Sequence, residues 1–222
     1  MSINLSKRIF TSLLLSIILI IGLFLNKFIF LYSLIVVSII SCQEFYNLIK
    51  KIFKNQKSKM YLFNTLSVIY LGIFTTISYI FYDISFEKFA FALLVCIFSD
   101  TGGYLIGNLV GGRKLTKLSP KKTISGCIGS FIFSLIPIAI YWFILENSYT
   151  LKDNSLIELI FVCMFLSLIC QIGDLYISYF KRRAGVKDTG TILPGHGGLL
   201  DRIDGLIFVL PVAFILNKIF VL

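Results

Sequence analysis

Long apolar runs alternate with short polar segments along almost the whole chain. Several runs approach or exceed the roughly 20 residues that an α-helix needs to cross a hydrocarbon core of about 30 Å. They are continuous, whereas the strands of a membrane barrel would alternate apolar and polar positions over about ten residues. The pattern therefore predicts an all-α, polytopic integral membrane protein with about seven transmembrane helices. The predicted spans are 9–25, 28–46, 61–82, 89–110, 126–145, 156–174 and 205–221.

The first two spans carry polar residues that bear on their interpretation. Lys7 and Arg8 precede the first run, as they would in a signal peptide. No small-residue cleavage site follows and the next apolar run begins almost at once, so we interpret the first run as a membrane helix. The second span contains Glu44, which we expect at or near the membrane interface. We predict a single membrane domain, 1–222, whose N-terminal transmembrane helices occupy 1–90.

Composition agrees with this class, since hydrophobic residues make up 57% of the 222 and charged residues only 14%. Mean hydropathy is +0.91. Of the 21 Lys and Arg, 17 fall in the four segments 1–8, 47–60, 111–125 and 175–204. The positive-inside rule then places the N-terminus and the three long loops in the cytoplasm and the C-terminus outside, as in a protein of the cell's inner membrane.

The net charge of +10 does not indicate a nucleic-acid partner. The basic clusters lie between membrane spans, and no nucleic-acid-binding module is visible. Topogenic anchoring and attraction to anionic membrane lipid account for most of these residues. The five cysteines all fall in predicted spans without a CxxC pair, so we interpret them as packing residues and not as a metal site or disulfide framework.

Two carboxylates fall inside apolar runs. Asp100 lies in the fourth predicted span and Asp174 closes the sixth. A charge at such depth costs several kcal/mol unless it faces a partner or water, so each is either a functional group or half of an interhelical contact. Gly103, Gly107 and Gly111 recur at intervals of four beside Asp100, which favours close helix packing over phosphate binding.

A basic loop precedes the fifth predicted span. Arg113, Lys114, Lys117, Lys121 and Lys122 gather around a Ser-Pro turn there, and a Lys-Thr pair stands immediately before the helix. A helix start presents free N–H groups and a positive dipole end, which suit a triphosphate or a lipid phosphate. Positive-inside anchoring is the alternative, and the loop by itself does not separate the two.

The most polar block of the chain, 178–204, follows the sixth span. If the sixth helix continues past the membrane, Asp174, Ser178 and Lys181 share one face at intervals of four and three. The LPGHGG segment then ends any helix, because proline has no N–H and glycines permit tight turns and a close approach of the backbone to a ligand. His196 within it suits acid–base chemistry or a hydrogen bond that holds the loop.

Two more carboxylates end this block. Asp201 and Asp204 are three residues apart, so one helical turn would present both, with Arg202 beside them. Two hard oxygen ligands one turn apart, together with Asp174, predict a Mg²⁺ site, and the flanking cations supply charge for nucleotide phosphate oxygens.

The block closely resembles the signature of the phosphatidate cytidylyltransferase (CDP-diacylglycerol synthase) family. The matching positions are Ser178, Lys181, Arg182, Lys187, Asp188, His196, Gly197, Gly198, Asp201, Arg202 and Asp204. The QIGDL, SDTGGY and SPKKT segments also resemble family segments in the expected order, so the similarity covers roughly 95–205 and marks 91–222 as the catalytic half. The N-terminal half matches only in apolar character, and the chain looks short for the family.

The resemblance implies the reaction of CTP with phosphatidate to give CDP-diacylglycerol and pyrophosphate, at the cytoplasmic face. It implies a cofactor of Mg²⁺, alone or with a second cation, held by Asp174, Asp201 and Asp204, and a catalytic role for Lys181 and Arg202. An assembly of one chain or a homodimer is left open. The substrate-binding residues that it implies are Lys121, Lys122, Thr123, Ser178, Lys181, Arg182, Lys187, Asp188, His196, Gly197 and Gly198.

One position departs from the family pattern, because Ser125 stands where members often have an acidic residue. Two other functions are compatible with the composition. A CTP-dependent lipid-alcohol kinase is the nearest enzyme, but the intact 178–204 pattern favours the synthase. An ion-coupled transporter would use intramembrane carboxylates and would show broken helices in two matching repeats, which are not visible here.

Overall fold

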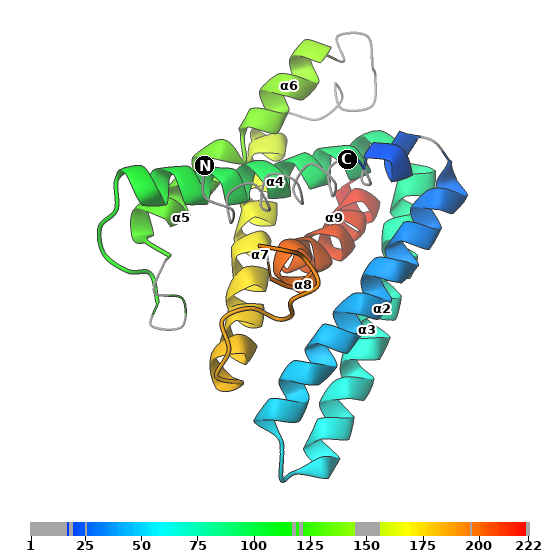
Figure 1. The fold of residues 1–222 in the computed structure, drawn as a ribbon. Coiled ribbons are helices and arrows are strands. Elements are labelled where there is room, and N and C mark those ends of the chain that lie inside the picture. The colour runs from blue at the N-terminus through cyan, green and yellow to red at the C-terminus, as the bar shows by residue number, and fades with distance from the viewer. Residues whose placement is uncertain are drawn as a thin grey trace. The chain divides into compact units, whose positions relative to one another are not determined.

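The described part of the chain is built almost entirely of α-helices (Figure 1). The computed structural model describes residues 17, 20–24, 26–116, 119, 122–144, 156–195 and 197–220, so most of the first predicted span lies outside the described residues. The helices are α2 (Lys27–Ile52), α3 (Lys57–Ile84), α4 (Phe86–Leu109), α5 (Ile124–Phe133), α6 (Ile136–Ile144), α7 (Leu156–Arg183), α8 (Leu200–Ile203) and α9 (Leu206–Phe220).

Five stretches of the described residues are long and apolar enough to cross a membrane. They are α2, α3, α4, α7 and the combined stretch Ile124–Phe143 of α5 and α6. The chain is therefore an integral membrane protein, and its described part is all-helical apart from its connections. α9 has 15 residues, which span about 22 Å at 1.5 Å per residue. The predicted count of seven spans is not confirmed.

Two predicted spans differ in extent from the helices. The fifth divides into α5 and α6 at Ser134 and Leu135, next to Pro137. Proline has no N–H to donate to the carbonyl of Phe133, so one helix hydrogen bond is missing at this break. The sixth continues as α7 to Arg183, past the apolar run, which meets the condition under which Asp174, Ser178 and Lys181 share one helix face.

The helices belong to two compact units whose boundaries fall inside α3 and α7. Unit 1 comprises Met1–Tyr79 and Phe180–Ile203, and unit 2 comprises Ile80–Tyr179 and Asp204–Leu222.

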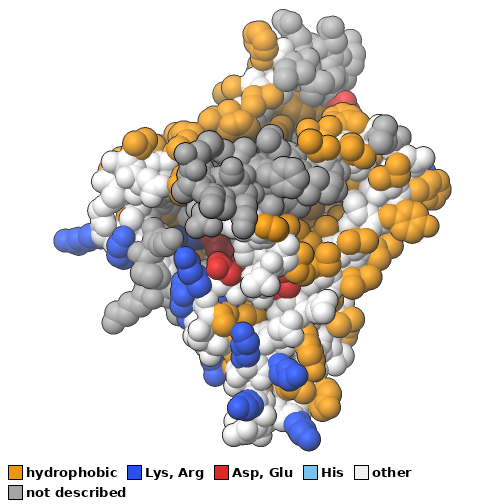
Figure 2. Space-filling model, viewed as in Figure 1, with side chains coloured by type: hydrophobic (Ala, Val, Ile, Leu, Met, Phe, Trp, Pro, Cys, Tyr) orange, Lys and Arg blue, Asp and Glu red, His pale blue; other side chains and the backbone are white. Residues whose placement is uncertain are grey.

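In unit 1, α2 and α3 lie side by side as an antiparallel hairpin (Figure 1). The Ser38 and Thr75 hydroxyls are 2.6 Å apart across it. An aromatic cluster closes one end, where the ring centroids of Phe45 and Phe180 are 5.1 Å apart and those of Phe63 and Phe180 are 6.0 Å apart. Apolar side chains cover much of the outer surface of both helices (Figure 2), as expected of helices that face lipid.

In unit 2, α5 packs closely on α4 through small residues. A Cβ built on Gly103 would lie 2.5 Å from the Ser130 hydroxyl, and one on Gly107 would lie 3.1 Å from the Thr123 hydroxyl. The predicted packing role is thus confirmed for Gly103 and Gly107. It is wrong for Gly111, which follows the end of α4, has a φ of 63° and has no atom within 4 Å of a built Cβ. Gly111 serves the turn and not the helix contact.

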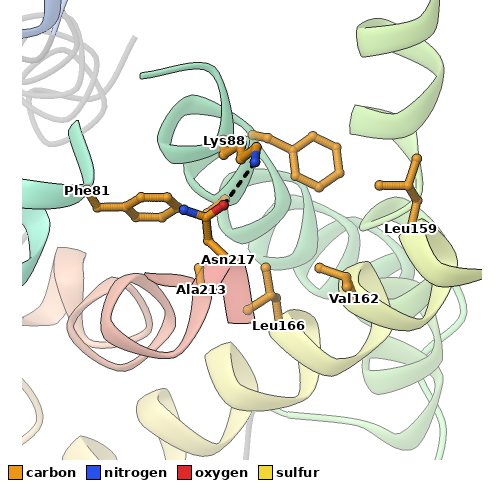
Figure 3. A pocket seen from close by; sticks show the side chains of 9 residues that line it. Phe81, Lys88, Leu159, Val162, Leu166, Ala213 and Asn217 are labelled. Atoms are coloured by element: carbon orange, nitrogen blue, oxygen red, sulfur yellow. Dashed lines mark hydrogen bonds between the residues drawn. The ribbon is translucent and has the colours of Figure 1, made fainter. Parts of the chain in front are cut away.

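The remaining helices of unit 2 meet at its core. Val95 of α4, Leu166 of α7 and Val209 of α9 are buried there. Near the start of α4, the Lys88 ammonium donates a hydrogen bond of 3.0 Å to the side-chain oxygen of Asn217 on α9 (Figure 3). The surrounding pocket is otherwise mostly apolar and contains none of the predicted site residues.

Candidate active site

The polar segment between α7 and α8 folds as a series of glycine turns in unit 1. Gly185, Gly195 and Gly197 have φ values of 68°, 80° and 88°, which residues with a Cβ rarely adopt. Leu193 and Gly197 exchange two backbone hydrogen bonds of 2.9 and 3.1 Å, which close the turn between them. The predicted role in tight turns is confirmed for Gly195 and Gly197, and Gly185 adds a turn that was not predicted.

Asp201 is the anchor of this segment. One of its oxygens lies 2.7 Å from the Lys181 ammonium, and the two side chains are only 6% and 12% exposed. The other oxygen accepts hydrogen bonds from the Thr189 amide at 2.8 Å, the Thr189 hydroxyl at 3.0 Å and the Gly198 amide at 3.0 Å. Both carboxylate oxygens are therefore engaged by protein donors, and a metal at Asp201 would have to replace one of them.

A second carboxylate, Glu44 of α2, reaches the same segment. It is 2% exposed and accepts hydrogen bonds from the amides of Leu199 and Leu200 and from the Thr189 hydroxyl. From the sequence, Glu44 is expected at or near the membrane interface, with no role at the site. The signal was present, because an acidic residue inside an apolar run needs a partner for the same reason as Asp100 and Asp174.

Asp174 forms the corresponding ion pair in unit 2. Its carboxylate lies 2.5 Å from the Lys122 ammonium, and both side chains are partly exposed, at 30% and 24%. The Ser178 hydroxyl donates to it from one turn further along α7, at 3.4 Å. The structure thus brings the predicted basic loop to the predicted carboxylate, across about fifty residues of sequence.

The basic loop is tied to the start of α5. Thr123 caps the helix, because its hydroxyl accepts a hydrogen bond of 3.1 Å from the Gly126 amide. The Ser125 hydroxyl donates to the Gly111 carbonyl and lies 3.0 Å from the Thr123 hydroxyl. The backbones of Lys114 and Thr123 pair as in a short antiparallel β-bridge. The serine that departs from the family pattern therefore has a structural partner in this chain.

Asp204, also in unit 2, is buried between α8 and α9. One of its oxygens accepts a hydrogen bond of 3.0 Å from the Gly205 amide. Its backbone carbonyl lies against α7, 2.7 Å from a Cβ built on Gly173, the residue before Asp174. Since Asp201 belongs to unit 1 and the other two carboxylates to unit 2, a single three-carboxylate site stays a prediction.

The other predicted site residues have less definite surroundings. Lys121 and His196 lie outside the described residues. Four further residues are exposed on the described surface: Arg182, Lys187, Asp188 and Arg202. The three cations, Arg182, Lys187 and Arg202, are accessible to an anionic ligand or to lipid headgroups. The predicted substrate contacts of all four residues stay predictions.

Two of the cysteines form a group that their spacing did not indicate. The thiols of Cys96 on α4 and Cys170 on α7 are buried and 3.0 Å apart. An Asp100 oxygen lies 3.4 Å from the Cys170 sulfur, and all three potential ligand atoms are within 4.8 Å of one another. Asp100 therefore makes the interhelical contact that the sequence analysis gave as the alternative to a functional role.

Comparison with known proteins identifies the family of this chain. The model of the cytidylyltransferase family matches residues 48–220. The phosphatidate cytidylyltransferases of Staphylococcus haemolyticus (strain JCSC1435) and Staphylococcus aureus (strain COL) are each 44% identical over 156 residues, which is 69% of this chain and 58% of theirs. That of Staphylococcus saprophyticus subsp. saprophyticus is 42% identical over the same shares. The chain thus spans less than two thirds of the length of these relatives. The resemblance seen in the sequence is confirmed, and the chain belongs to the cytidylyltransferase family.

Proposed function

We propose that this protein is a phosphatidate cytidylyltransferase, which transfers CMP from CTP to phosphatidate and releases pyrophosphate. One observation carries the proposal beyond family membership. Charged residues from distant parts of an apolar chain form two carboxylate–ammonium pairs, Lys122–Asp174 and Lys181–Asp201. Such pairs near a membrane supply both the cations that bind phosphate and the carboxylates that bind a divalent metal.

The reaction needs little acid–base chemistry. An anionic phosphate oxygen of phosphatidate forms a bond to the α-phosphorus of CTP, and the bond from that phosphorus to the oxygen bridging to the β-phosphorus breaks. The electron pair leaves with pyrophosphate, so no general base is required. What the protein must supply is alignment of the two substrates and neutralisation of their negative charge.

The basic side chains suit that task. Lys122 stands just before the N-terminal end of α5, where the helix dipole adds positive potential. Lys181 holds Asp201, and its ammonium can pass to a phosphate oxygen if that carboxylate is engaged elsewhere. Arg182 and Arg202 are exposed and can follow the triphosphate or the lipid phosphate.

The donor set fits Mg²⁺, which prefers hard oxygen ligands. Asp174 and Asp204 would hold the ion in unit 2, and Asp201 of unit 1 would offer an oxygen to a cation only if it released one of its present donors. Bound Mg²⁺ would orient the phosphate oxygens and offset their charge. If a second cation binds, the same carboxylates would supply its oxygen ligands.

The orientation proposed from the charge distribution places these residues at the cytoplasmic face of the inner membrane. Lys50, Lys51, Lys54, Lys57 and Lys59 gather at the tip of the α2–α3 hairpin, where all five are exposed (Figure 2). By the positive-inside rule, such a cluster anchors a hairpin tip on the cytoplasmic side of a membrane. Labelling of single cysteines introduced at this tip, in cells with an intact membrane, tests the orientation.

The direct test is an assay of purified protein in detergent with labelled CTP, Mg²⁺ and phosphatidate. We expect labelled CDP-diacylglycerol and an equal amount of pyrophosphate. A parallel reaction offers a polyprenol in place of phosphatidate. Phosphorylation of that alcohol without formation of CDP-diacylglycerol would identify a lipid-alcohol kinase instead. Light scattering of the active fraction distinguishes one chain from a homodimer.

A further inference from the structure

We propose that Glu44 is a positioning residue of the candidate active site: its buried carboxylate fixes the 189–201 segment and thereby sets the orientation of Asp201. The inference rests on the proposed function, because only in that reaction is Asp201 a candidate metal ligand. It concerns a residue of the second span, in the half of the chain that precedes the signature.

The geometry of Glu44 is that of a helix cap supplied from another helix. The first amides of a helix have no partner within it, and for α8 the carboxylate of Glu44 accepts from Leu199 at 3.0 Å and from Leu200 at 2.9 Å. Caps usually come from the residue just before the helix, whereas Glu44 is 155 positions from Leu199. The packing of α2 therefore decides whether α8 begins here.

Two glycines of the segment make room for this carboxylate. A Cβ built on Gly190 would lie 2.5 Å from one oxygen of Glu44, and one built on Gly198 would collide with the other oxygen and with the Thr189 hydroxyl. Gly198 has no positive φ to explain its identity. The atoms around Gly198 indicate that the backbone here approaches the carboxylate of Glu44. From the sequence, the glycines of this segment were expected to let the backbone approach a bound ligand.

Thr189 connects Glu44 to Asp201. Its hydroxyl lies 2.8 Å from a Glu44 oxygen and 3.0 Å from an Asp201 oxygen. A hydroxyl has one hydrogen and donates to one acceptor at a time. When Asp201 turns an oxygen to a metal or a substrate, the hydroxyl can donate to Glu44 and remains satisfied. Glu44 therefore holds the segment in place while leaving Asp201 free to exchange a partner.

The test compares Glu44→Gln with Glu87→Gln, a matched change at a helix glutamate that accepts a hydrogen bond from Tyr141. The side-chain amide of Gln keeps the shape of Glu44 but turns one acceptor into a donor, which faces the backbone amide of either Leu199 or Leu200. We expect kcat to fall by about 10–100-fold, with KM for CTP within about threefold and a higher Mg²⁺ concentration for half-maximal rate. Glu87→Gln should leave all three unchanged.

A second readout does not depend on turnover. Hydrogen exchange of the peptide containing Gly198–Leu200 should accelerate about tenfold or more in Glu44→Gln and stay unchanged in Glu87→Gln. If the wild-type protein makes no CDP-diacylglycerol, the proposed function fails, and this exchange rate still decides whether Glu44 holds the segment. Unchanged exchange, or a wild-type kcat, in Glu44→Gln overturns the inference.

A further variant covers the case in which Glu44→Gln does not accumulate as folded protein. Thr189→Val removes the hydroxyl that joins the two carboxylates and leaves Glu44 in place. We expect kcat to fall about fivefold or more while the protein elutes as one folded species. A wild-type kcat in Thr189→Val would overturn the link between Glu44 and Asp201.

Discussion

Replacing Asp201 by alanine should destabilise the protein as well as inactivate it. The carboxylate pairs with Lys181 at 2.7 Å, and the two side chains are only 6% and 12% exposed. Removing one partner of a buried pair costs about 3–5 kcal/mol, because the other charge stays buried without a counterion. The amides of Thr189 and Gly198 lose their acceptor in the same step.

The expected loss is large enough to measure by thermal unfolding in detergent. At about 2–4 °C per kcal/mol for a chain of this size, the apparent midpoint should fall by roughly 6–20 °C. Asp188→Ala is the matched control, since this aspartate is exposed in the same segment, and it should shift the midpoint by less than about 2 °C.

A double substitution separates the buried charge from the hydrogen bonds. Asp201→Leu combined with Lys181→Met leaves no unpaired charge, so it should be less destabilised than Asp201→Ala alone. A midpoint within about 2 °C of wild type for Asp201→Ala, or a double variant that is worse than the single one, would refute the reasoning. Asp201 would then contribute little to the free energy of unfolding, and the segment around it would be stable without its carboxylate.

Three further predictions follow from unit 2. Gly102→Ala places a Cβ 2.6 Å from the Gly129 carbonyl and should lower the unfolding free energy by about 1–3 kcal/mol. The control is Gly72→Ala in α3, where a Cβ meets no atom within 4 Å and the change should be neutral or stabilising by up to about 1 kcal/mol. Equal melting curves for the two variants would contradict the close α4–α5 contact. Lys122→Ala should raise KM for CTP about tenfold or more while kcat changes less, as measured by initial rates, and an unchanged KM would exclude it from the nucleotide site. Asp204→Ala should abolish turnover at saturating Mg²⁺ and leave the elution profile unchanged; near-normal rates in that variant would remove it from the metal site.

Much of the fold could be predicted because membrane insertion depends on local sequence. The lengths of the apolar runs predicted α2, α3, α4 and α7 to within a few residues at most ends. The extension of α7 to Arg183 entered only as the condition for placing Asp174, Ser178 and Lys181 on one face. The break between α5 and α6 was missed, although Pro137 is visible in the sequence. The seventh predicted span, 205–221, begins within one residue of α9, whose described residues run from Leu206 to Phe220.

The candidate site could be predicted in part. The sequence identified Asp174, Lys181 and Asp201, because a charge within or beside an apolar run requires a counterion, a hydrogen-bond partner or water. Their partners could not be read from the sequence, since a carboxylate near many cations has no preferred one until the chain folds. Thr189 was missed for a different reason: a hydroxyl becomes informative only when its acceptors are known.

The sequence by itself determined that this is a helical membrane protein with charge concentrated in a few segments, because hydrophobic length and charge position are properties of the chain in one dimension. Only the tertiary structure decided which charges meet. It paired Lys122 with Asp174 and Lys181 with Asp201, and it brought Glu44 to the start of α8. In an apolar interior each buried charge must find a donor or counterion, and helix packing determines which one lies within reach.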